Sequence, residues 1–344
     1  TQARLAGRVN ANGTLNIDIN GNAPLGLSRP FLAPRNLQGQ ARFDLSVNGR
    51  AALSSVSGTI QTTNATFTAP NLRLAVQDIA ADIRLANNRA QVAVTGNASH
   101  GGRLNVDGSV VLGGALAADL AIGLQQIVLV DPKLYRSSIN GALRLAGPLT
   151  GGAKISGQLD VGETEISVPS TGLTSIGDIP PINHIGATRP VIATRRKAGI
   201  EDAGAGTDPT AKAGAGFGLN VRVNAPNRIF VRGRGIDAEL GGALTITGNT
   251  NRVISAGRFD LLRGRLDILG KRFDLVEGSI QFRGDLVPYI RFVSATATNT
   301  GEVRVVVQGS ADAPEVTFES TPESPQDEVL AQLLFGRNLS EISP

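Results

Sequence analysis

Few residues of this sequence belong to the types that carry out acid–base, nucleophilic or metal chemistry. There are two histidines, His100 and His184, and no cysteine or methionine. His100 stands in a Ser-His-Gly-Gly run, and His184 comes shortly after a pair of prolines. Neither has an acid or a second histidine at the spacing of a metal site. Both histidines are therefore predicted to lie in surface turns or loops and to hold no metal.

Motifs for nucleophilic catalysis and phosphate binding are absent as well. The sequence contains no G-x-S-x-G nucleophile elbow. The glycine-rich run at 214–218 precedes a predicted strand, whereas a phosphate loop leads into a helix. The acidic residues mostly alternate with apolar ones, as expected on the wet side of strands. The sequence thus predicts a protein that is not an enzyme and that carries no cofactor.

Positive charge is spread along the chain. Lysine and arginine number 33 and aspartate and glutamate 29, for a net charge of +4, while aromatic residues make up 4%. A nucleic-acid surface favours clustered basic residues with interleaved aromatics. The arginines here stand mostly singly, so the charge pattern predicts a solvated basic face and no nucleic-acid partner.

The elements that would position any site are strands. Apolar residues recur with period 2 almost throughout, which predicts about twenty half-buried strands. Clear examples are Leu15/Ile17/Ile19, Phe43/Leu45/Val47, Leu120/Ile122/Leu124, Leu219/Val221/Val223 and Val303/Val305/Val307. The predicted hairpin turns are Asn12-Gly13, Asn48-Gly49, Gly101-Gly102, Asn140-Gly141 and Gly248-Asn249. The predicted fold class is all-β, an elongated and curled antiparallel-rich sheet with an apolar groove and one short C-terminal helix.

An internal echo indicates which side chains share a face. Arg-Phe-Asp-Leu occurs at 42–45, 258–261 and 272–275. With two-residue turns at Arg263-Gly264 and Glu277-Gly278, alternate residues form apolar cross-strand pairs. This register sets two aspartates, at positions 260 and 267, opposite each other, which is unfavourable unless an arginine or solvent relieves the repulsion.

The same alternation predicts an apolar wall suited to acyl chains, because hydrocarbon requires no specific polar partner. The predicted lipid-facing residues are Phe259, Leu261, Leu266, Ile268, Phe273, Leu275, Ile280, Phe282, Ile290, Phe292, Val303, Val305 and Val307. Alternation alone leaves open whether a second sheet covers this wall or hydrocarbon can reach it.

Three regions are predicted along the chain. Residues 1–185 form a repetitive β-sheet region, 186–216 a flexible Gly/Ala/Pro loop or insertion, and 217–344 a β-sheet region that ends in a helix. A helix is predicted over about 324–335, with Ser324 as its cap and a leucine-rich stripe packed on the last strands.

Several absences predict that the sequence is an excerpt. There is no initiator methionine, no signal peptide and no run of eighteen apolar residues. Any membrane anchor is therefore expected outside these residues.

The second half of the sequence carries a recognisable series of segments. These are FVRGRGIDAELGGALTITG at 230–248, GRFDLLRGRLDILGKRFDLVEGSIQFRGDLVPYI at 257–290, and the stretch 303–344 with its tail DEVLAQLLFGRNLSEIS. Together they resemble the C-terminal domain family of TamB, a component of the translocation and assembly module within the AsmA-like lipid-transfer superfamily. Residues 130–172 resemble the region just upstream in such proteins, whereas 1–125 share only the repetitive style.

The resemblance implies a taco-shaped β-sheet with an apolar interior, in the periplasmic portion of an inner-membrane-anchored envelope protein. It implies phospholipid passage between the inner and outer membranes, or assembly and secretion of outer-membrane proteins, and it leaves open which is primary. It also implies an Omp85-class barrel as partner, through regions outside this sequence. The alternative from the residues alone is a secreted β-solenoid, structural or adhesin-like, with a solid core.

Overall fold

The computed structural model describes most of the chain. The residues described are 2–32, 35–70, 73–168, 188, 216–268, 270–298 and 301–329. Contacts divide the chain into two compact units: Thr1–Pro169 together with Ala215–Pro344, and Ser170–Gly214. The first unit holds all the strands that the structure describes. The predicted insertion at 186–216 lies, apart from two residues, outside the described residues, so the predicted division into regions stays a prediction.

Eighteen strands form one sheet in the described part of the chain. The first nine are β1 Gln2–Val9, β2 Leu15–Pro24, β3 Asn36–Gln38, β4 Gln40–Gly49, β5 Val56–Ala69, β6 Leu74–Ala86, β7 Arg89–Ala98, β8 Arg103–Val111 and β9 Ala117–Asp131. The second nine are β10 Tyr135–Pro148, β11 Lys154–Ser167, β12 Gly218–Gly233, β13 Ile236–Asn249, β14 Arg252–Ile268, β15 Lys271–Gly284, β16 Tyr289–Thr298, β17 Gly301–Ser310 and β18 Ala313–Thr321. The helical pieces are η1 Leu25–Ser28, α1 Arg29–Leu32, η2 Leu53–Ser55 and a turn at 326–329.

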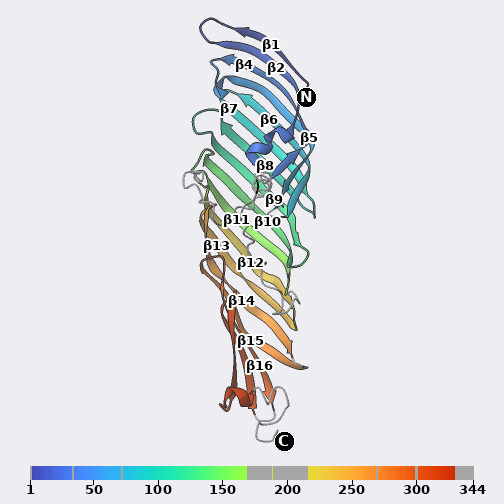
Figure 1. Cartoon of the computed structure of the whole chain (residues 1–344), viewed down its shortest axis with the longest axis vertical. Coiled ribbons are helices and arrows are strands. Elements are labelled where there is room, and N and C mark those ends of the chain that lie inside the picture. Colours follow the sequence, from blue (N-terminus) through green and yellow to red (C-terminus); the bar gives the residue numbers. More distant parts are fainter. Residues whose placement is uncertain are drawn as a thin grey trace. The chain divides into compact units, whose positions relative to one another are not determined.

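The strands pair mainly with their neighbours in sequence, so that the colours of Figure 1 follow one another along the sheet. β3 pairs with one end of β5, and β4 pairs with the other part of the same strand. All pairs are antiparallel except β11 with β12. Parallel neighbours need a long connection, and the chain between these two strands passes through the second unit. Among the described pairings β1 and β18 do not meet, so the sheet is open.

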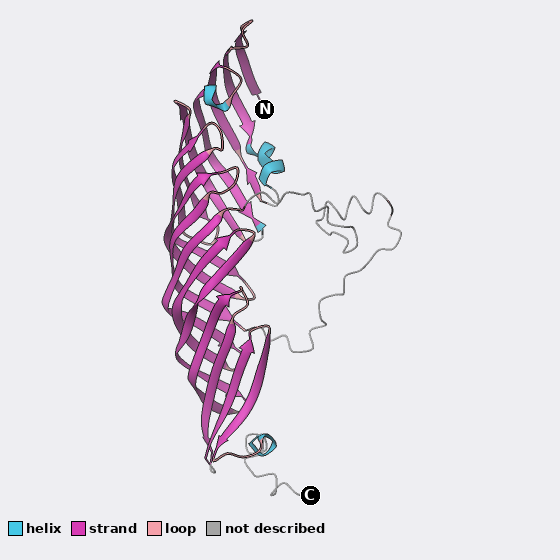
Figure 2. Cartoon of the chain, turned by 90° about the vertical axis from the view of Figure 1, so that its left-hand side faces the viewer, coloured by secondary structure: helices cyan, strands magenta, loops and turns pink. Residues whose placement is uncertain are grey.

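The sheet curls about its apolar face (Figure 2). One apolar cluster joins β12 and β13 to β14, β15 and β16, bringing Phe292 together with Ile229 and Leu240. Strands three places apart in a flat sheet stand about 14 Å apart, too far for such packing. The all-β class and the open, curled, antiparallel-rich sheet are therefore confirmed. A β-solenoid would instead stack parallel strands, which occur here at one described pairing only.

The predicted hairpins around the repeated Arg-Phe-Asp-Leu segments are wrong. Arg263-Gly264 lies inside β14 and Glu277-Gly278 inside β15, each of which runs on as a single long strand. In both strands one extra residue follows the repeat, Leu262 in β14 and Val276 in β15, and forms a bulge in the pairing with the neighbouring strand. These two side chains point away from the apolar face and are 53% and 55% exposed.

The observed register removes the predicted clash between two aspartates. Asp260 is opposite Ser279, and Asp267 is opposite Arg272, with which it forms an ion pair of 3.0 Å. Of the predicted turns, Asn12-Gly13 and Gly101-Gly102 do join strands, whereas Asn140-Gly141 lies within β10.

The predicted C-terminal helix is present where the structure describes it. The backbone N–H groups of Glu328 and Val329 donate to the carbonyl oxygen of Pro325 at 2.9 and 3.1 Å. Val329 is fully buried and packs on β15 and β17. The described start of this helix therefore packs on the last strands, whereas the predicted leucine stripe and the rest of the range, 330–335, lie outside the described residues.

Candidate functional site

The main surface feature is a row of apolar side chains that crosses many strands. Directly opposed residues of neighbouring strands project from the same face, so the register identifies each row. The central row, one residue from each strand β7 to β13, is Val94, Val106, Ile122, Leu143, Gly157, Val221 and Ile246. Residues two positions before and after each member of this row point to the same side of the sheet. We call the surface that all of these side chains form the apolar face.

The residues predicted from the sequence lie on this face and are brought together. Four pairings join them directly: Leu266–Phe273, Phe259–Ile280, Ile280–Ile290 and Phe292–Val307. Each bulge adds one residue to its strand and so shifts the alternation of side chains by one position. Apolar residues before and after the bulge therefore both point toward the apolar face, although an odd number of positions separates them. The side chain of Ile268 lies outside the described residues.

Burial differs along the predicted set. Phe273, Val303 and Val305 expose only 2%, 1% and 6% and form a closed cluster with Val329. The remaining described members are half-buried: Phe259, Leu261, Leu266, Leu275, Ile280, Phe282, Ile290, Phe292 and Val307. The apolar face is thus filled by protein around Phe273, Val303 and Val305, whereas it keeps partly exposed hydrocarbon around Phe259, Phe282 and Phe292.

A glycine lets β13 and β14 approach closely beside the aromatic part of the face. Gly257 sits between Leu244 and Phe282 in the register and has φ +159°. A Cβ at this position would come within 2.3 Å of the carbonyl oxygen of Ala243. The Phe282 ring meets the ring of Phe259 edge to face, with centroids 6.3 Å apart, a favoured geometry for aromatic pairs.

The apolar face extends well beyond the residues predicted for it. Ile122, Leu143 and Val223 are half-buried on it, and no second sheet covers them in the part of the chain that the structure describes. The signal for these residues was available in the sequence, since the same period-2 alternation runs through β9, β10 and β12. Prediction from the repeated segment alone confined the site to one end.

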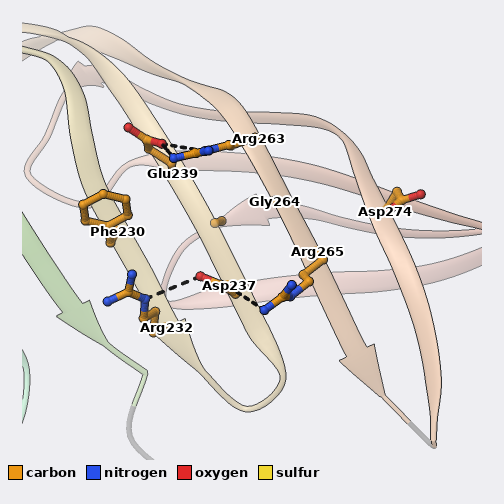
Figure 3. A pocket seen from close by; sticks show the side chains of 9 residues that line it. Phe230, Arg232, Asp237, Glu239, Arg263, Gly264, Arg265 and Asp274 are labelled. Carbon is orange, nitrogen blue, oxygen red and sulfur yellow. Dashed lines mark hydrogen bonds and ion pairs between the residues drawn. The ribbon is translucent and has the colours of Figure 1, made fainter.

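The opposite face is polar, and two hollows on it are lined by charged side chains, most of which are paired. One hollow of about 450 Å³ lies over β12, β13 and β14 (Figure 3). In it Arg263 pairs with Glu239 at 2.7 Å, and Asp237 bridges Arg232 and Arg265 at 3.5 and 3.0 Å. A second hollow lies over β14 to β16, and its charged side chains also form ion pairs, Arg258 with Asp260 and Arg291 with Glu277.

Glu239 shows what these contacts do to the charged groups. The backbone N–H of Arg228 donates to its carboxylate at 3.1 Å, and the Arg263 guanidinium donates at 2.8 Å. These two contacts, the backbone one foremost, hold the pKa of Glu239 below its ordinary value. Such a group stays ionised at neutral pH and is suited to holding strands together rather than to proton transfer.

His100 does not belong to a metal site. His100 is exposed in the turn after β7, with its Nδ1 3.1 Å from the Ser99 hydroxyl. His184 lies outside the described residues. No group of His, Asp and Glu arranged to hold a metal occurs in the described ranges. Within those ranges there is also no helix with the length and apolar character needed to cross a membrane.

Comparison with known proteins agrees with this geometry. The family model of the TamB C-terminal domain matches residues 88–343. The translocation and assembly module subunit TamB of Haemophilus influenzae is 30% identical over 136 residues, which cover 37% of this chain and 10% of that protein. The chain thus spans about a tenth of the length of this curated relative. Because the family model matches well over half of its residues, the chain belongs to the TamB C-terminal domain family.

Proposed function

We propose that this chain serves in a translocation and assembly module of the bacterial envelope, where its apolar face carries phospholipid acyl chains between the inner and outer membranes. It does so without catalysis, as a surface along which hydrocarbon is shielded from water. Family membership supports the role in the module, and the apolar face supports the lipid as cargo. The proposed location is the periplasm, and the proposed protein partner is an Omp85-class outer-membrane barrel.

The observation that carries the proposal is the apolar row from β7 to β13, over which no second sheet lies in the described part of the chain. Its half-buried members are Val94, Val106, Ile122, Leu143 and Ile246. Contiguous apolar patches of more than a few hundred Å² are rare on monomeric proteins and mark contact with hydrocarbon or with a partner. An acyl chain of about sixteen CH₂ groups gains on the order of 13 kcal/mol on leaving water, at about 0.8 kcal/mol per group. A wall of aliphatic side chains supplies this gain without selecting the headgroup.

The same face also suits handling of outer-membrane protein clients, whose strands have one apolar side. Ser137 and Thr164 are buried in the row of Ile229, but their hydroxyls hydrogen-bond each other at 2.7 Å and so offer no free partner that would favour a β-strand over an acyl chain. We therefore place lipid first and treat client protein as the competing outcome of the experiment below.

The test is photo-crosslinking from matched positions on one strand. A benzophenone amino acid replaces Leu143, on the apolar face, or Ala142, which is exposed on the polar face beside Gln158. The purified chain is incubated with vesicles of phosphatidylethanolamine and phosphatidylglycerol, irradiated and analysed by mass spectrometry. We expect phospholipid adducts from position 143 and few from 142, because only the former meets hydrocarbon.

Leu143→Asp provides the functional counterpart, with Ala142→Asp as its control. A half-buried charge on the apolar face should lower phospholipid co-purification about tenfold, since each tenfold in affinity needs only about 1.4 kcal/mol. Equal lipid adducts from both crosslinking positions, or protein adducts alone from position 143 in cells, would contradict the proposal. Leu143 is preferable to Phe273 or Val305, because a charge at those buried positions would unfold the C-terminal cluster.

A further inference from the structure

The segment between β2 and β4 leaves the sheet and returns over the apolar face. Its residues 25–39 form η1, α1 and β3, and the helical turns lie beside the sheet instead of within it (Figure 2). The ends of the segment are joined, since the N–H of Leu25 donates to the carbonyl oxygen of Gly39 at 2.9 Å. β3 holds its second half against β5. We call residues 25–39 the crossover.

The crossover and the sheet together line a partly open apolar cavity of about 340 Å³. Leu25 and Leu37 form its cover, and strands β4 to β8 form its floor and walls, with Ile83 and Leu104 among them. No charged side chain lines the cavity, and the hydroxyl of Thr62 is occupied by a hydrogen bond to the carbonyl oxygen of Gln40 at 2.7 Å. A polar ligand would find no partner here, whereas hydrocarbon would.

The volume fits one hydrocarbon chain. An apolar cavity of roughly 150 Å³ takes up benzene, which has six carbon atoms. The cavity under the crossover is more than twice as large and therefore accommodates about twelve carbon atoms of an aliphatic chain. The cavity therefore holds most of one acyl tail but is too small for a whole phospholipid. The headgroup must lie outside it.

The segment that borders this cavity carries positive charge. The crossover has two exposed arginines, Arg29 and Arg35, and the side chain of neither forms an ion pair or hydrogen bond within the described part of the chain. Residues 1–50 contain six arginines and two aspartates, so this end of the sheet accounts for the net charge of the chain. Free guanidinium groups bind phosphate through paired N–H donors.

We propose that the crossover covers a seat for one acyl chain of an anionic phospholipid, with the lipid phosphate bound by Arg29 and Arg35. The inference rests on the proposed function and goes beyond it, because it places a holding site at one point of a surface that is otherwise open. Most of the residues concerned precede the part matched by the family model. A lipid held here has one tail enclosed, while its neighbours on the open face stay free to move.

The experiment uses phosphatidylglycerol vesicles that contain a diazirine-labelled acyl chain, with phosphatidylcholine vesicles as the comparison. After irradiation, the labelled peptides of the chain are mapped by mass spectrometry. We expect labelling both at β5 to β8, under the crossover, and at β9 to β12, on the open face. Labelling at β5 to β8 should favour phosphatidylglycerol, and the double variant Arg29→Gln/Arg35→Gln should abolish that preference.

Filling the cavity separates the seat from the open face. Ala81 lines the cavity, whereas Ala93 is exposed on the polar face opposite Asp82 and Asp107. Ala81→Phe should lower labelling at β5 to β8 about tenfold and leave β9 to β12 unchanged, while Ala93→Phe should change neither. Ala81→Leu, a smaller filler, keeps the test valid if the phenylalanine variant does not fold.

The outcomes distinguish the two proposals. Labelling at β9 to β12 without labelling at β5 to β8 in the unmodified chain overturns the seat and leaves the proposed function standing. Absence of labelling in both regions overturns the proposed function itself. Equal labelling at β5 to β8 in Ala81→Phe and Ala93→Phe also overturns the seat, because the label then lies outside the cavity.

Discussion

At the scale of single residues, charged side chains on the polar face connect each strand to its immediate neighbours. Glu239 in β13 receives donors from Arg228 in β12 and Arg263 in β14, so one carboxylate joins three strands. Exposed ion pairs contribute little to stability one by one. A carboxylate that accepts a backbone N–H as well as a guanidinium N–H is better fixed, which is what lowers its pKa.

Replacing Glu239 with glutamine should change the acid sensitivity of this part of the sheet. Because the pKa of Glu239 is lowered by folding, its contribution to stability is full above its ordinary value of 4.5 and is lost as the pH falls through the folded value. Glu239→Gln should therefore unfold at lower temperature than the parent near pH 7, and the difference should shrink toward about pH 3. Thermal unfolding followed by circular dichroism across this range measures it.

The matched control for that experiment is Asp274→Asn. Asp274 lines the same hollow and makes no ion pair within the described residues (Figure 3). We expect this variant to follow the parent at every pH. A constant difference between Glu239→Gln and the parent across the pH range would show that the carboxylate contacts do not contribute as argued.

At the scale of elements, the two ends of the apolar face are closed by short segments outside the sheet. The crossover covers β5 to β8 near one end, and the turn at 326–329 inserts Val329 against Phe273, Val303 and Val305 at the other. A helix of this length would not persist alone in water. Among the described residues of this turn, Val329 is the side chain that packs in the cluster and stabilises it by burial.

Shortening the Val329 side chain tests whether its burial stabilises the turn at 326–329 and the strand β17 beneath it. Val329→Ala should reduce the free energy of opening of β17 by about 1–3 kcal/mol, through lost burial and the cavity left behind. Gln326→Ala, an exposed change in the same turn, should stay within about 0.5 kcal/mol. Hydrogen exchange of the Val303–Val307 amides measures both variants. Equal protection in the two variants would mean that the turn does not hold β17.

At the scale of the whole sheet, nearly every strand is hydrogen-bonded only to the strands before and after it in sequence. Stability in such an arrangement is close to a sum of local terms, and distant parts open independently. The first unit therefore differs from a globular β-sandwich, in which two sheets share one core. Independence of the two ends also suits a surface along which cargo passes in steps.

A local distortion should consequently stay local. Gly58 in β5 has φ +122°, and a Cβ there would lie 2.1 Å from the carbonyl oxygen of Asp44. Gly58→Ala should reduce protection of β4 to β6 amides by about 1–3 kcal/mol or more and leave β14 to β17 unchanged. Gly26→Ala, where a Cβ meets open space, is the control. A uniform loss of protection along the whole sheet would show global cooperativity instead.

The sequence determined by itself the fold class, the two faces and much of the apolar wall. Period-2 alternation assigns each side chain to a face irrespective of which strand lies next to it, so residues such as Phe259 and Ile280 were placed correctly. It also gave the family, through segments whose spacing is specific. The pairing of strands around the repeats was predicted wrongly, because glycines at 264 and 278 were interpreted as turn residues.

Only the tertiary structure decided the register and the closed ends. Gly278 leaves room for the ring of Phe292, since a Cβ there would approach it within 2.7 Å, so this glycine serves packing and not a turn. A single long strand with one bulge keeps its hydrogen bonds to both neighbours, which a hairpin at that point would lose. That choice depends on the full length of the neighbouring strands, which a local turn motif does not contain, and the burial of Val329 depends on strands farther away in the sequence. Local pattern fixes which way a side chain points, whereas its neighbours are set by the pairing of the whole sheet.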